Sequence, residues 1–184
     1  QMKDINQYHR SDFNQVGKKI GYAEITTNIY INRGIEEGIL IPINDVYLVH
    51  RDSFILDESI LEKVSDFLSE RIKEKGYLSC YQLQGMRRKL PRLEKYSWSP
   101  ELVYYVATQY LSYKRINIKG VTHTVDPLLI STNEKERTYS QIVVELLKYY
   151  RGNMHEENIA EYLSEQGLIR TKNKQLPQVL FEEE

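Results

Sequence analysis

The chain has 184 residues, of which 41% are hydrophobic and 28% charged, and its formal net charge is −1 at pH 7. These totals are typical of a soluble globular protein, and the single cysteine, Cys80, excludes an intramolecular disulfide and a multi-cysteine zinc site. No apolar run approaches the ~18 residues that a membrane-spanning helix needs, so we expect a cytoplasmic protein without a membrane partner. The first residue is Gln1, which suggests a fragment of a larger protein with missing upstream domains.

The first helix is predicted to begin at Asp12. Phe13, Val16 and Ile20 recur at helical spacing, and Gly21 has the conformational freedom that ends many helices. Residues 1–11 are polar and show no periodicity. The pattern therefore predicts a short helix that closes in a turn.

A second helix is predicted from Ala23 to about Glu37, with Ile25, Ile29 and Ile35 facing inward. Its exposed face is expected to carry polar side chains, namely Thr26, Thr27, Asn28, Asn32 and Arg33. Two short helices joined by a tight turn are typical of a helix-turn-helix.

A β-hairpin is predicted after this pair of helices. Residues 38–43 and 46–49 are apolar runs separated by the turn pair Asn44-Asp45. Pro42 has no backbone N–H to donate, so its strand is predicted to lie at the edge of the sheet.

The clearest helix signal follows Asp57, a good N-cap. Apolar residues then repeat at intervals of three, four and seven positions until Gly76 ends the helix. They are Ile60, Leu61, Val64, Phe67, Leu68 and Ile72. A shorter helix is predicted from Ser79 to about Leu90, before Pro91.

Ser99-Pro100-Glu101 predicts another helix start, because it combines a capping hydroxyl, a proline in the first turn and an acidic residue. A two-stranded ribbon is expected next, with strands at 116–118 and 121–125 about the turn Lys119-Gly120. Residues 57–130 are thus predicted to form a three-helix unit closed by a ribbon.

The last part of the chain predicts two more helices. One runs from about Thr138 to Tyr150, and the other begins at a capping-box-like pair, Asn153 and Glu156, and ends before Gly167. The residues after 170 mix polar residues with Pro177 and predict a loose tail.

The order helix, basic turn, helix and hairpin resembles the winged-helix superfamily of DNA-binding proteins. The resemblance implies a mainly α fold with small β-hairpins, an α+β fold of tandem winged-helix-like units. Residues 1–51 would form a unit whose first helix is missing or poorly formed, and 52–131 a complete unit. Residues 132–184 would form a two-helix unit with the loose tail.

A basic segment lies between residues 84 and 119. It contains eight Lys or Arg residues and only two acidic residues, Glu94 and Glu101, so its local charge is +6. Such clusters bind phosphates through counterion release, without reading the sequence. The predicted phosphate contacts are Arg87, Arg88, Lys89, Arg92, Lys95, Lys114, Arg115 and Lys119. The alternative is that these charges pair with residues 132–169, an acidic segment that contains seven Glu and four Lys or Arg.

In winged-helix modules the third helix enters the major groove. The resemblance therefore implies base reading by Thr26, Thr27, Asn28, Asn32 and Arg33, and by Tyr104, Tyr105, Thr108 and Gln109. Asn and Gln can pair with adenine edges and Arg with guanine. The alternative is that these residues form ordinary solvated helix faces.

No enzyme, metal or cofactor is predicted. His155-Glu156 lacks the second histidine of a zinc protease motif, since position 159 is Ile, and the other histidines show no ligand spacing. The sequence predicts a non-enzymatic segment of a bacterial or phage protein that binds duplex DNA. The alternative is a protein–protein interaction scaffold with tyrosine-rich faces as contacts, which another domain capping Tyr104 and Tyr105 would favour.

Overall fold

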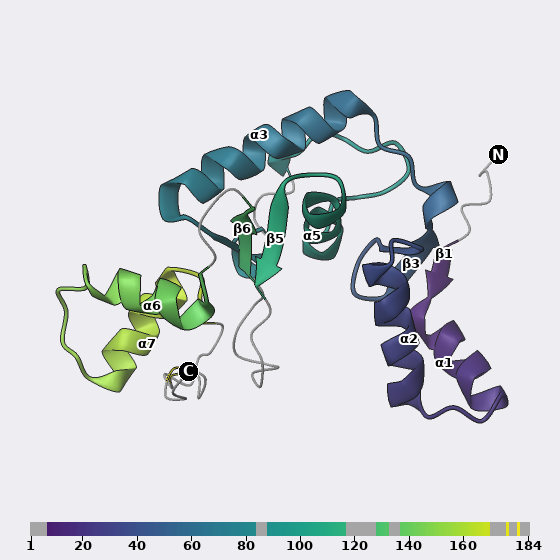
Figure 1. Cartoon of the computed structure of the whole chain (residues 1–184), viewed down its shortest axis with the longest axis horizontal. Helices are drawn as coiled ribbons and strands as arrows, with labels where there is room; N and C mark the ends of the chain where they lie inside the picture. Colours follow the sequence, from purple (N-terminus) through teal and green to yellow (C-terminus); the bar gives the residue numbers. More distant parts are fainter. Residues whose placement is uncertain are drawn as a thin grey trace. The chain divides into compact units, whose positions relative to one another are not determined.

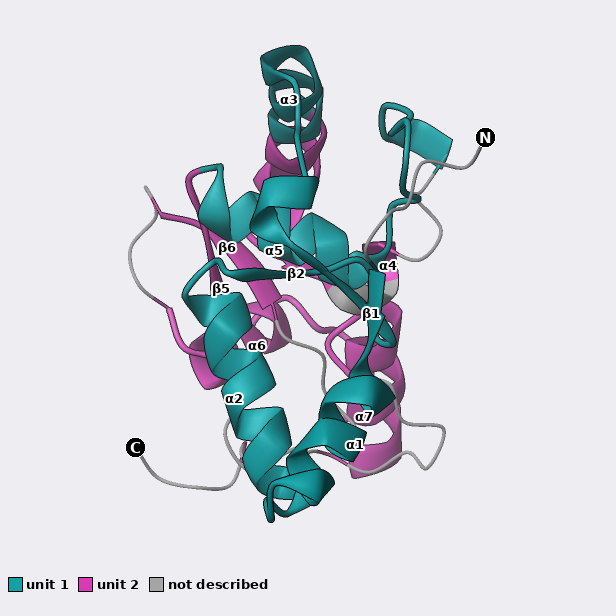
Figure 2. Ribbon diagram, turned by 90° about the vertical axis from the view of Figure 1, so that its right-hand side faces the viewer, with its two compact units in different colours: residues 1–66, 87–111 teal, residues 67–86, 112–184 magenta. Residues whose placement is uncertain are grey.

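The computed structural model describes residues 7–83, 88–116, 128–132, 137–169, 176 and 180, without the side chains of residues 80 and 81. The chain forms two compact units, one of residues 1–66 and 87–111 and the other of 67–86 and 112–184 (Figure 2). The described residues fold into helices and two three-stranded antiparallel sheets, which confirms an α+β fold. Neither unit follows the predicted ranges 1–51, 52–131 and 132–184, which remain a prediction about domains.

Unit 1 contains a sheet of β1 (Gln7–His9), β2 (Leu40–Pro42) and β3 (Tyr47–His50), in the order β1-β3-β2. The predicted hairpin is confirmed as β2 and β3, which pair from Leu40 opposite His50 to Pro42 opposite Leu48. Asn44 closes the turn, since its Oδ1 accepts hydrogen bonds from the backbone N–H groups of residues 46 and 47. Pro42 lies on an edge strand, as predicted.

Helices α1 (Arg10–Lys19) and α2 (Glu24–Glu36) follow β1 and pack side by side (Figure 1). Helix α1 begins two residues before the predicted start because the His9 side chain caps it, accepting from the Ser11 backbone N–H at 3.1 Å. Asp12 completes the capping box by accepting from the His9 backbone N–H. Gly21, with φ of 88°, forms the turn between the helices.

Unit 1 also holds the 3-10 turn η1 (Arg51–Ser53), the first half of α3 (Glu58–Lys75) and α5 (Pro100–Gln109). Helix α3 begins directly after Asp57 and ends at Gly76, as predicted. The predicted start of α5 is also confirmed, since the Ser99 hydroxyl accepts from the Leu102 N–H at 3.0 Å. Helix α5 packs against β2.

The helix predicted from Ser79 to Leu90 is wrong in its extent. The described helix α4 spans only Cys80–Leu83, and Arg88 and Lys89 lie in a 3-10 turn. At the start of α4 the side chains of Ser79 and Gln82 bond to each other's backbone N–H groups. The residues from 84 to 87 lie outside the described residues.

Unit 2 contains the second sheet, built of β4 (Leu78–Ser79), β5 (Tyr113–Ile116) and β6 (Leu128–Ser131) in the order β4-β6-β5. Strands β5 and β6 pair from Tyr113 opposite Ser131 to Ile116 opposite Leu128. An antiparallel ribbon thus follows α5, and its described strands share only Ile116 with the predicted range 116–125. Residues 117–127, including the predicted second strand and Lys119-Gly120, lie outside the described residues.

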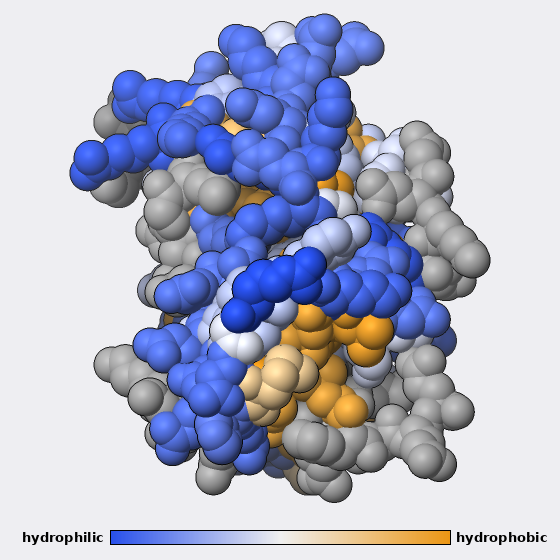
Figure 3. All heavy atoms as spheres, turned by 90° about the vertical axis from the view of Figure 1, so that its left-hand side faces the viewer, coloured by the Kyte–Doolittle hydropathy of each residue, from blue (hydrophilic) through white to orange (hydrophobic). Residues whose placement is uncertain are grey.

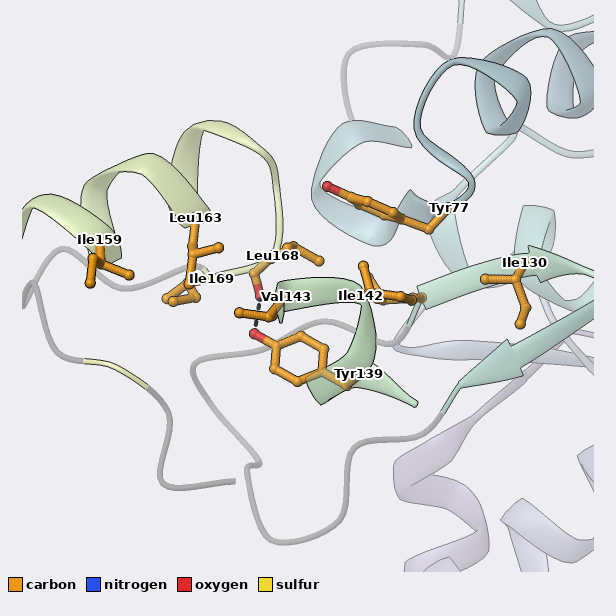
Figure 4. Close-up of a cluster of buried hydrophobic side chains, with 10 residues drawn as sticks. Tyr77, Ile130, Tyr139, Ile142, Val143, Ile159, Leu163, Leu168 and Ile169 are labelled. Carbon is orange, nitrogen blue, oxygen red and sulfur yellow. Dashed lines mark hydrogen bonds between the residues drawn. The ribbon is translucent and has the colours of Figure 1, made fainter. Parts of the chain in front are cut away.

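Helices α6 (Tyr139–Leu147) and α7 (Glu156–Glu165) complete unit 2. Thr138 caps α6 in a capping box with Gln141, whereas α7 begins after His155 without the predicted Asn153–Glu156 box. The core is formed by side chains from the helices, β6 and the segment after Gly167 (Figure 4). Within it the Tyr139 hydroxyl donates to the Leu168 carbonyl at 3.2 Å.

Candidate nucleic-acid interface

The outward face of α2 differs from the prediction. Ile25 is 72% exposed and Ile29 is 61% exposed, so the expectation that both face inward is wrong. Thr27, expected on the exposed face, is only 7% exposed. It lies against Gly17 of α1, and its hydroxyl is directed at the Ala23 carbonyl, to which it donates at 3.4 Å.

The other predicted base-reading residues of α2 are accessible to different degrees. Asn32 and Arg33 are exposed, and Thr26 and Asn28 are half-buried. The Arg33 Nε donates to Glu37 Oε1 at 2.8 Å, an exposed ion pair one helical turn apart that contributes little to stability. These four side chains therefore surround the exposed isoleucines on the same helix.

Helix α5 does not present the predicted tyrosines to solvent. Tyr104 is 5% exposed and Tyr105 is 6% exposed, because α5 is buried on nearly all sides. Burial raises the pKa of the Tyr105 hydroxyl to about 12, and nearby Tyr110 adds to this effect. Thr108 is half-buried and its hydroxyl donates to the Tyr104 carbonyl at 2.9 Å, whereas Gln109 is exposed.

The basic segment falls partly within the described residues. Arg88, Lys89, Arg92 and Lys95 are exposed in unit 1, where the chain between α4 and α5 is anchored by buried Leu90, Leu93 and Trp98. The Trp98 indole N–H donates to the Pro91 carbonyl at 2.6 Å. A fixed backbone thus carries four cations at the surface.

The remaining cations of the segment belong elsewhere or lie outside the described residues. Lys114 and Arg115 lie on β5 in unit 2, where the first is half-buried and the second exposed, and both make interactions within the protein. Arg87 and Lys119 lie outside the described residues.

Unit 1 also exposes apolar side chains that the sequence did not single out as a surface. Besides the two isoleucines of α2, those near α1 and α2 are Val16, Ile20, Tyr22 and Tyr30, and Ile55 is exposed elsewhere in the unit. Tyr22 and Tyr30 stack with ring centroids 5.8 Å apart. In unit 2, Val144 and Tyr149 are exposed, and Figure 3 shows apolar atoms at the surface of the face that carries α6 and α7.

Two of the described histidines have local roles. His9 caps α1, and His50 Nδ1 lies 3.3 Å from an Asp52 carboxylate oxygen beside the turn η1. Among the described residues no three His, Cys, Asp or Glu side chains gather as metal ligands. Within the same part of the chain, no helix combines the length and the apolar character needed to cross a membrane.

Neither a family model, nor a curated protein, nor a solved structure matches this chain. The candidate interface therefore rests on the chain's own geometry. Its accessible part comprises the outward face of α2 and the cations between residues 88 and 95.

Proposed function

We propose that this chain is a non-enzymatic DNA-binding protein built of tandem winged-helix-like units, in which α2 enters the major groove. The supporting observation is the helix pair α1–α2, joined by a turn of four residues and followed by the hairpin β2–β3. The close contact of Gly17 with Thr27 holds the two helices together and leaves the opposite face of α2 exposed. A helix-turn-helix docks its second helix in this way.

The second sheet supports the tandem arrangement. In both sheets the third strand along the chain lies in the middle, in the orders β1-β3-β2 and β4-β6-β5. Within the described residues, two helices lie between the first and second strands of each sheet, and an antiparallel pair follows. The same order of elements thus occurs twice along the chain.

The proposed base-reading residues are those of α2 that solvent reaches. They are Thr26, Asn28, Asn32 and Arg33, while buried Thr27 is left out. We also leave out Tyr104 and Tyr105, because a side chain buried in its own unit has no access to a groove. Of the α5 residues, only Gln109 retains an exposed side chain with groove-reading chemistry.

The phosphate contacts are proposed for the exposed cations Arg88, Lys89, Arg92 and Lys95. Positive charge at these positions would fix the protein on the duplex without specifying a sequence. Arg87, Lys114, Arg115 and Lys119 stay in the proposal as further contacts from the same basic segment.

A mobility-shift titration of the full chain against random duplex DNA, single-stranded DNA and RNA at several salt concentrations tests the proposal. We expect preferential, salt-sensitive binding to the duplex, because phosphate contacts release counterions. If the chain binds no nucleic acid at low salt, the proposed function is wrong.

A protein–protein interaction scaffold is the second candidate function. It is favoured by the exposed apolar side chains of α1 and of the α1–α2 turn. Exposed apolar patches are typical of protein contact sites. A scaffold would show no salt-dependent DNA affinity in the same titration.

A further inference from the structure

The outward face of α2 has an apolar centre. With 3.6 residues per turn, positions 25, 29 and 32 of α2 lie on one side of the helix. Ile25 and Ile29 are the central residues of that side, because Thr27 and Ile31 on the opposite side are buried. An exposed branched apolar side chain gains the free energy of burial only when a ligand covers it.

Polar groups flank the two isoleucines. Asn28 and Asn32 lie along one edge of this face, and Arg33 and Thr26 along the other. Lys18 and Lys19, both exposed, end the preceding helix and add positive charge near the start of α2. Such a surface suits a ligand that offers methyl groups, amide-pairing edges and negative charge together.

The acidic residues of α2 restrict how the ligand can lie. Glu36 and Glu37 are exposed at the C-terminal end, about 16 Å along the helix axis from Ile25. Glu24, at the N-terminal end, accepts a hydrogen bond from the Asn14 side-chain amide at 3.3 Å. The stretch of α2 from Ile25 to Arg33 is therefore suited to a polyanion, whereas the C-terminal end with Glu36 and Glu37 is not.

In the major groove, thymine offers a C5-methyl group and adenine offers the donor–acceptor pair that asparagine recognises. We propose that Ile25 and Ile29 contact thymine methyl groups, so that the chain selects A·T-rich duplexes. This inference rests on the proposed DNA-binding function and deepens it by naming the preferred ligand.

The test compares two duplexes that differ only in the methyl group. The full chain is titrated against a short duplex of alternating dA and dT, and against the same duplex with deoxyuridine in place of every thymidine. Uracil pairs as thymine does but lacks the C5-methyl. Burial of one methyl is worth about fourfold in affinity, so we expect about fifteenfold weaker binding to the uracil duplex if both isoleucines make a contact.

Variants assign the effect to α2. Ile25→Ala with Ile29→Ala should bind both duplexes equally, at about the affinity that the wild type shows for the uracil duplex. Val16→Ala with Ile20→Ala removes two exposed aliphatic side chains from α1 and from the residue that ends it, and it should keep the preference for thymine. Circular dichroism and thermal unfolding check that both variants are folded. The comparison of the two duplexes with the wild-type protein does not depend on any variant folding.

Three outcomes overturn the inference. Equal wild-type affinity for the two duplexes would leave DNA binding intact and assign the isoleucines to a protein contact. A loss of preference in the α1 variant that equals the loss in the α2 variant would also refute the assignment. Absence of binding to either duplex at low salt would overturn both the inference and the proposed function. The other two outcomes overturn the inference alone.

Discussion

Thr27 of α2 lies directly against Gly17 of α1, and a Cβ atom added to Gly17 would collide with the Thr27 hydroxyl oxygen. The glycine at position 17 therefore sets how closely the two helices approach. This contact turns α2 so that Thr27 is buried and Ile25 faces solvent.

We expect Gly17→Ala to destabilise the protein, although alanine normally favours a helix by about 0.5–1 kcal/mol. Overpacking costs ~1–3 kcal/mol and should outweigh that gain. Gly34→Ala is the matched control, because its Cβ would meet only the half-buried Leu40 side chain, with Cδ1 at 3.1 Å and Cγ at 3.3 Å, and this side chain can move. Urea unfolding should show a clear loss for the first variant, and equal effects of the two would contradict this explanation.

Leu68→Ala should lower the free energy of unfolding by ~2–5 kcal/mol, because Leu68 of α3 is fully buried. Ser69→Ala changes the exposed neighbour and should stay within about 0.5 kcal/mol of the wild type. Denaturant unfolding measures both. A loss below about 1 kcal/mol for the leucine variant, the range usual for surface positions, would place the core of α3 elsewhere.

Arg88→Ala with Arg92→Ala should weaken duplex binding about equally for all sequences, because phosphate contacts carry no base information. The slope of log affinity against log salt concentration should flatten by roughly 0.9 for each lost contact, up to about 1.8 in the double variant. Lys63→Ala with Lys73→Ala removes two exposed cations of α3 and should leave the slope unchanged. An unchanged slope in the arginine variant would reject the phosphate role.

Stability should fall in alkali partly through Tyr105, because burial raises the pKa of its hydroxyl to about 12 from the ordinary tyrosine value of 10.0. Between these pH values the unfolded chain releases the phenolic proton while the folded chain keeps it, so unfolding becomes more favourable as the pH rises. Tyr105→Phe should reduce this pH dependence by up to about one proton. Tyr149→Phe, at an exposed position, is the control, and an identical pH profile in both variants would show that Tyr105 does not contribute.

Local signals predicted the helix ends well. Ser99-Pro100 and the glycines at 76 and 167 act through neighbouring backbone groups, so a few residues of sequence suffice to recognise them. The hairpin β2–β3 and its edge proline follow from equally local rules. An α+β fold was therefore predictable from the sequence.

The outward face of α2 was not predictable in the same way. Ile25 and Ile29 form one apolar stripe at a spacing of four, and Ile31 and Ile35 form another. Periodicity alone cannot choose between them, and the choice depends on the contact between Gly17 and Thr27, ten positions apart.

The burial of α5 could have been predicted from the sequence, despite the polar hydroxyl groups of its tyrosines. Six consecutive residues from 102 to 107 are apolar or aromatic, and a helix that is apolar all round is usually buried. Strand β6 had a signal in the sequence too, since Leu128-Leu129-Ile130 is a short apolar run directly after the predicted ribbon of 116–125.

The two units alternate along the chain, since residues 67–86 of unit 2 are placed between the two segments of unit 1. During synthesis on the ribosome, the first 66 residues therefore cannot complete their unit until α5, which ends at Gln109, has been made. At about 5–20 residues per second this delay lasts several seconds, during which apolar side chains such as Ile41 and Leu48, buried in the finished unit, lack part of their cover. For the same reason no single proteolytic cut can release either unit intact, and a truncation at residue 66 would remove the helix that packs on β2.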